Sequence, residues 1–129
     1  MKPVYQDPKE PECGAACIAM LAGVTIEEAR RAVYGEKPPK RLGRKKVLDA
    51  LTGHFSIKPK SKDCILLSKK FRLTDLKDNA LLQGAVLARD GKRWTKSLHW
   101  LVWDHGSQCV RDPLGFSDTI QITSATEVE

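Results

Sequence analysis

Apolar residues in the first half of the chain recur at the spacing of amphipathic helices. The pattern predicts three of them, at residues 14–21, 26–34 and 44–52. Thr25 and Glu28 match a capping box at the start of the second helix. Glycine readily takes the left-handed conformation that follows a helix, so one glycine is expected to end each helix. These glycines are Gly23, Gly35 and Gly53.

The second half of the chain changes period, with short apolar or alternating runs separated by turn residues. The runs predict strands at residues 64–67, 85–88, 98–103, 108–110 and 119–122. Hairpin turns are expected at residues 90–91 and 105–106. Thr74 is expected to cap a short helical piece before Gly84. Helices followed by closely connected strands indicate an α+β fold, in which the N-terminal helices pack on an antiparallel sheet.

Length and composition favour one domain, residues 1–129, that needs no disulfide or metal to fold. Residues 1–12 are polar and broken by three prolines, so they predict an extended lead-in without a signal region. No apolar run is long enough to span a bilayer. The four cysteines are too sparse for a secreted disulfide framework. We therefore expect a cytoplasmic protein, or one exported without a signal peptide, with reduced thiols and no membrane partner.

The net charge of +6 is concentrated in two segments. Residues 37–46 carry six lysines and arginines, and residues 58–70 carry five lysines. Such segments are either solvated surface or a place for an acidic protein partner. Nucleic acid is a disfavoured partner, because no aromatic side chains interleave with the cations to stack on bases.

Cys13 lies where the lead-in is predicted to become a helix. The first backbone N–H groups of a helix lack intrahelical partners, and the helix dipole places partial positive charge there. Both effects stabilise a thiolate, which makes Cys13 a candidate nucleophile. Cys17, one turn later, is expected to face the core.

A nucleophilic cysteine needs a general base and a group that orients that base. His99 interrupts an otherwise apolar strand, so its ring requires either a cleft or a hydrogen-bonded structural role. His54, in a loop, and His105, in a turn, are secondary candidates. The turn at residues 105–106 would bring Asp112 back beside His99 as the orienting group. The alternative role of Asp112 is to cap an Asp-Pro turn.

Three elements of the chain together resemble a known family. They are Glu-Cys-Gly-Ala-Ala-Cys at residues 12–17 before an apolar helix, His99 in an apolar strand, and Asp-Pro-Leu-Gly at residues 112–115. In this order they are similar to the C39-like branch of the papain-like cysteine peptidases. The resemblance implies a papain-like fold in which Cys13 attacks a carbonyl, His99 acts as general base and then acid, and Asp112 orients His99.

The resemblance also implies that Gln6 helps the Cys13 amide to bind the oxyanion. Gln6 stands seven residues before Cys13, where the family usually has six. It further implies a hydrolase, a thiol protease that needs no cofactor beyond its reduced thiol. The substrate would be a protein or peptide, with acidic character if the basic segments line the cleft.

Several alternatives stay open at this level. A papain-like scaffold can bind a peptide or partner without cleaving it. The same nucleophile can serve an amidase, a deconjugase or an acyltransferase. A zinc site can be written from Cys13, Cys17, His99 and His105, although their spacing is not that of a zinc knuckle. The oligomeric state is not fixed by the sequence.

Overall fold

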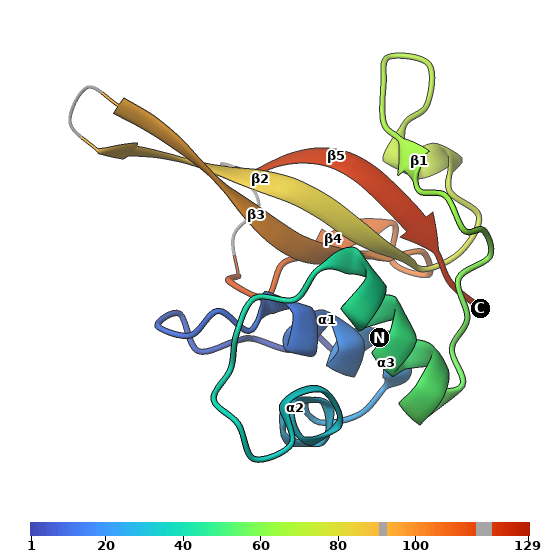
Figure 1. Cartoon of the computed structure of the whole chain (residues 1–129). Coiled ribbons are helices and arrows are strands. Elements are labelled where there is room, and N and C mark those ends of the chain that lie inside the picture. Colours follow the sequence, from blue (N-terminus) through green and yellow to red (C-terminus); the bar gives the residue numbers. More distant parts are fainter. Residues whose placement is uncertain (91–92, 116–119) are drawn as a thin grey trace.

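The computed structural model describes the backbone of residues 1–90, 93–115 and 120–129, and their side chains apart from residues 86–90 and 93–96. It is an α+β structure, as predicted, with three helices beside an antiparallel sheet (Figure 1). The helical elements are α1 (Cys13–Ala22), α2 (Ile26–Tyr34), α3 (Arg44–Phe55) and the 3-10 turn η1 (Leu73–Asp75). The strands are β1 (Ile65–Leu66), β2 (Ala80–Asp90), β3 (Arg93–Asp104), β4 (Cys109–Arg111) and β5 (Ile120–Glu127).

The ends of α1 and α2 follow the predicted signals closely. Gly23 takes a φ of 70° and ends α1, and Gly35, with a φ of 61°, ends α2. The Thr25 hydroxyl accepts a hydrogen bond from the Glu28 N–H at 3.1 Å, which caps α2. The Glu28 carboxylate accepts from the Thr25 hydroxyl at 3.3 Å rather than reaching back to its backbone, so the capping box is only half of the expected one.

The prediction that Gly53 stops α3 is wrong. The helix continues to Phe55 and ends at Ser56, which takes the left-handed conformation with a φ of 57°. Glycine inside a helix costs only about 1 kcal/mol relative to alanine. Burial of the apolar residues Val47 and Leu51 offsets this cost, because both are completely buried on the preceding turns of the same helix.

The sheet has the strand order β1-β5-β2-β3-β4, and every pairing is antiparallel. All five predicted strands are found, but β2, β3 and β5 are longer than their apolar runs. The additional residues are paired with the neighbouring strand whether they are apolar, as at the start of β2, or polar, because backbone pairing does not require an apolar side chain. β2 and β3 form one continuous hairpin from Ala80 opposite Trp103 to Asp90 opposite Arg93.

Two of the predicted connections can be compared with the structure. The turn expected at residues 105–106 is present and covers residues 105–108 between β3 and β4. Thr74 lies inside η1 and does not cap it; Arg72 is the residue before the turn, and its N–H bonds to the Asp75 carboxylate at 2.7 Å. Gly91 in the other expected turn, and Thr119 of the last expected strand, lie outside the described residues.

The two faces of the sheet bury two separate apolar clusters. Leu81, Trp100 and Val102 pack with the helices, whereas Leu82 and Leu101 belong to the opposite face, beneath the segment that contains η1. Alternate residues of a strand point to opposite faces, so one hairpin supplies both clusters. The helix-side cluster fixes α1 against β3, the strand that carries His99.

A glycine lies directly across the hairpin from His99. Gly84 pairs with His99, and the pairing of β2 with β5 shifts register between Gln83 and Gly84. A Cβ atom at Gly84 would lie 2.8 Å from the Ile120 side chain and 3.0 Å from the Gln121 carbonyl oxygen. β5 can therefore approach this point of the sheet only because residue 84 has no side chain.

None of the helices in the described part of the chain combines the length and the apolar character that a membrane crossing requires.

Candidate active site

Cys13 is the first residue of α1 and is half-buried, whereas the next seven residues of the helix are buried. Glu12 is the residue before the helix, and its side chain forms no capping hydrogen bond to α1. The backbone N–H groups of the first turn therefore remain available to another acceptor at this end of the helix. Cys17 is completely buried, as predicted, and its burial raises the pKa of its thiol well above the ordinary value.

His99 lies on β3 with only 4% of its surface exposed. Its Nε2 atom is 2.8 Å from Oδ1 of Asp112, a hydrogen-bond distance. Because Asp112 takes Nε2, Nδ1 is the ring nitrogen left to face the Cys13 thiol, and the interaction of His99 with Cys13 raises the His99 pKa and lowers the Cys13 pKa. The polar ring in an apolar strand is thus satisfied on Nε2 by a carboxylate.

Asp112 directly follows β4 and is held by two hydrogen bonds to the same oxygen. Its Oδ1 accepts from His99 and also from the Leu114 N–H, at 2.9 Å. The Gly115 N–H bonds to the Asp112 carbonyl at 2.9 Å, which closes a tight turn with Gly115 at a φ of 82°. The two roles considered for Asp112, turn cap and partner of His99, are therefore both filled by one carboxylate.

The pKa values of Cys13 and His99 move in opposite directions. Burial opposes ionisation of Cys13, but its hydrogen bonds with His99 and with the Trp100 backbone outweigh burial, so the Cys13 pKa lies below its ordinary value of 9.0. Burial also opposes protonation of His99. Its hydrogen bonds to Asp112 and Cys13 nevertheless raise the His99 pKa to about 9. Both shifts favour a thiolate paired with an imidazolium.

Gln6 lies at the border of this group, beside the segment that carries Asp112. Its N–H bonds to the Pro113 carbonyl at 2.9 Å, so the lead-in runs next to the turn after β4. Its side-chain Nε2 donates to the Glu10 carbonyl at 2.8 Å. One of the two side-chain N–H donors is thus committed within the lead-in, which leaves one for a ligand.

A buried ion pair behind Cys13 was not predicted from the sequence. Glu12 is completely buried, and its carboxylate binds Arg30 of α2 through two contacts of 2.6 and 2.7 Å. It also accepts from the Asp7 N–H at 2.9 Å. The bonds from Arg30 and Asp7 hold the Glu12 pKa below its ordinary value against the effect of burial. Glu12 therefore ties the lead-in and α2 to the start of α1, directly before the thiol.

A second ion pair lies at the turn between β3, which carries His99, and β4, which leads to Asp112. Asp104, at the end of β3, is buried and accepts from Arg111 at 3.1 and 3.2 Å. Arg111 stands immediately before Asp112. The pair therefore fixes the ends of β3 and β4, and with them the approach of Asp112 to His99.

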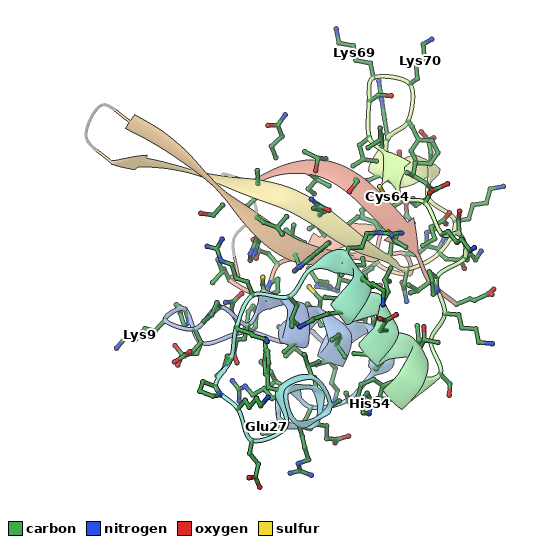
Figure 2. The ribbon with its side chains drawn as sticks, in the orientation of Figure 1. Lys9, Glu27, His54, Cys64, Lys69 and Lys70 are labelled. Carbon is green, nitrogen blue, oxygen red and sulfur yellow. The ribbon has the colours of Figure 1, made fainter. Side chains whose placement is uncertain are left out.

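The two other histidines considered as the general base, His54 and His105, lie outside the group formed by Cys13, His99 and Asp112. His105 is in the turn after β3, where its ring is 3.2 Å from the Gln108 amide, and His54 is near the end of α3 beside Phe55. Figure 2 shows His54 beside α3 at the helical side of the molecule. Among the described residues, His, Cys, Asp and Glu side chains form no group of three or more that could hold a metal ion.

The basic segments fall on two different parts of the structure. Lys69 and Lys70 lie at the end of a loop that projects beyond β1, and both point outward (Figure 2). Residues 37–46 instead lead from α2 into the first turn of α3, alongside the helical layer that contains Cys13 (Figure 1).

Comparisons with models of protein families, with curated proteins and with solved structures found no match. The chemistry of the site therefore has to be inferred from its own geometry.

Proposed function

We propose that this chain is a papain-like cysteine hydrolase that cleaves a peptide or isopeptide bond. One observation carries the proposal: the Asp112 carboxylate is hydrogen-bonded to His99, and His99 in turn lowers the pKa of the Cys13 thiol at the first residue of a helix. A carboxylate orients the imidazole, and the imidazole shares a proton with the thiol. The order of the three residues, and helices packed on an antiparallel sheet, support the papain-like arrangement.

The first half of the reaction forms a thioester. The Cys13 thiolate attacks the carbonyl carbon, a carbon–sulfur bond forms, and the carbonyl oxygen becomes an oxyanion. The Cys13 backbone N–H and the remaining side-chain N–H of Gln6 stabilise that oxygen. Protonated His99 then donates its proton to the leaving amine as the carbon–nitrogen bond breaks.

The second half releases the acid. His99, now neutral, takes a proton from water, which attacks the thioester carbon and expels the Cys13 thiolate. Asp112 holds the ring orientation through both steps and stabilises its charged form, as its bond to Nε2 requires. No cofactor takes part. The identity of the acceptor, water or another nucleophile, distinguishes a peptidase from an acyltransferase built on the same three residues.

The experiment is trapping of the acyl-enzyme during turnover of a peptide library. Rapid acid quenching should give a covalent adduct whose mass equals the acyl half of a cleaved peptide, attached to Cys13. Cys13→Ala should reduce cleavage to background, because no other residue of the site can supply the thiolate. Cys64→Ala is the matched control, since Cys64 is also a free, half-buried cysteine, and it should cleave normally. Cleavage that persists in Cys13→Ala would overturn the proposal.

A further inference from the structure

A groove lined by positive charge lies between the end of α2 and the segment that leads to α3. It has a volume of about 680 Å³. Four cations line it: Arg31, Lys37, Lys40 and Lys46. All four are exposed, and none forms an ion pair with any carboxylate in the part of the chain that the structure describes.

Glu28 and Glu36 are close to these cations along the chain, but neither lines the groove or forms an ion pair in the described part of the chain. Asp49 of α3 pairs with Lys45 at 2.8 Å, and Glu27 of α2 lies 3.9 Å from Arg30. No acidic side chain lines the groove. The lining of the groove therefore carries four positive charges and no negative one.

The remaining wall of the groove is apolar. Val33, Pro38, Pro39 and Leu42 contribute to it. A cavity of several hundred Å³ with an apolar wall and a few charged groups has the size and character of a ligand site. Its occupant should combine negative charge with hydrocarbon surface, as an acidic stretch of polypeptide does.

The segment that forms the groove is held in place before any ligand binds. The Tyr34 hydroxyl donates to the Lys40 carbonyl at 2.9 Å, and the Trp100 indole N–H donates to the Leu42 carbonyl at 2.8 Å. Two consecutive prolines further restrict the backbone. A preformed wall lowers the entropy that a ligand must overcome on binding.

The groove also shares a wall with the candidate active site. Leu42 lines the groove, and its Cδ1 atom would lie 3.1 Å from a Cβ atom built on Gly14, the residue after Cys13. Trp100, which anchors Leu42, follows His99 on β3. Leu42 thus connects the wall of the groove to the first turn of α1, which carries the thiol.

We infer that this groove binds an acidic segment of the polypeptide that Cys13 cleaves, to one side of the scissile bond. The inference rests on the proposed function for the choice of substrate, although the binding can be measured without cleavage. Nucleic acid fits less well, because the apolar wall consists of prolines and aliphatic residues and the Tyr34 ring is buried. No exposed aromatic face in the groove is available to stack on a base.

The test measures binding to the Cys13→Ala protein, which cannot turn over. The probe is a short fluorescent peptide with glutamate at every second position, and its twin carries glutamine instead. Fluorescence anisotropy should show that the glutamate peptide binds more tightly and loses affinity as salt is added. Changing Lys37, Lys40 and Lys46 together to glutamine should weaken binding about tenfold, since each exposed charge pair contributes modestly.

The matched control changes Lys62, Lys69 and Lys70 to glutamine, which removes the same charge from the segments before and after β1. It should leave binding within about twofold of the parent. Equal losses in both triple variants would show binding to net charge alone and would overturn the inference. Tighter binding of a single-stranded oligonucleotide through the same three lysines would overturn it as well. Specific peptide binding without cleavage by the intact protein would support the groove and contradict the proposed hydrolase.

Discussion

His99→Ala is expected to lower the rate of peptide hydrolysis by about 10²–10⁴-fold, the usual contribution of a positioned general acid and base. The imidazole both withdraws the thiol proton and protonates the leaving amine, and no other described side chain lowers the Cys13 pKa. The fold should survive, because Trp100 and Leu101, the next two residues of β3, remain in the core. Initial rates and far-ultraviolet circular dichroism of the same samples separate the two effects. An unchanged rate would remove His99 from the mechanism.

Asp112→Asn refines the same prediction, because it removes the charge while keeping the acceptor. An asparagine oxygen can still accept from His99 and from the Leu114 N–H, so the turn should be preserved. The rate should fall by about tenfold, less than in His99→Ala. Loss of the carboxylate also lowers the His99 pKa from about 9. The alkaline limb of the pH–rate profile, which follows deprotonation of His99, should therefore shift to lower pH. A pH–rate profile with an unmoved alkaline limb would place the orienting role elsewhere.

Arg30→Ala is expected to lower the free energy of unfolding by about 3 kcal/mol. The substitution leaves the Glu12 carboxylate without its partner, and only 1% of that side chain is exposed to water. Arg31→Ala is the control, because this neighbouring residue of α2 is exposed and forms no ion pair among the described residues. It should change the stability by less than about 0.5 kcal/mol. Denaturant unfolding curves with equal midpoints for the two variants would contradict the prediction.

The effect of Arg30→Ala should depend on pH with a defined sign. The pKa of Glu12 is lower in the folded protein than its ordinary value of 4.5, so the ion pair contributes its full stability above that value. This contribution is lost as the pH falls through the folded pKa. The difference in stability between the parent and Arg30→Ala should therefore be constant near neutral pH and should shrink below about pH 4.5. A difference that grows on acidification would have the wrong sign.

Local signals explain why much of the fold could be predicted from sequence. The three helices have apolar spacing together with caps at Thr25 and Gly23, which act within a few residues. Gly53 shows the limit of such signals, since packing of its own helix overrides a local stop. The lengths of β2 and β3 were underestimated because their far ends are stabilised by pairing with each other, which an apolar pattern does not reveal.

The candidate site also contains some residues that local sequence signals mark and some contacts that only the folded structure reveals. Cys13, His99 and Asp112 were identifiable because a helix start, a polar ring in an apolar strand and a turn each leave a local mark. The bond between Glu12 and Arg30 joins residues 18 positions apart on separate elements, so only the packing of α1 against α2 reveals it. The same holds for the groove: the sequence shows the charges of residues 37–46, but the cavity exists only where they fold against α2.

The most direct test of the proposed nucleophile is the rate of Cys13 alkylation by iodoacetamide as a function of pH, followed by mass spectrometry. Cys64 and Cys109, which are also free and half-buried, serve as internal comparisons, and buried Cys17 should remain unlabelled. Because the Cys13 pKa is lowered and the His99 pKa is raised to about 9, labelling of Cys13 should persist below about pH 7. In His99→Ala it should shift toward the behaviour of a free thiol. Labelling of Cys13 that rises only near pH 8.5, about the pKa of a free thiol, and is the same in His99→Ala, would contradict the catalytic pair.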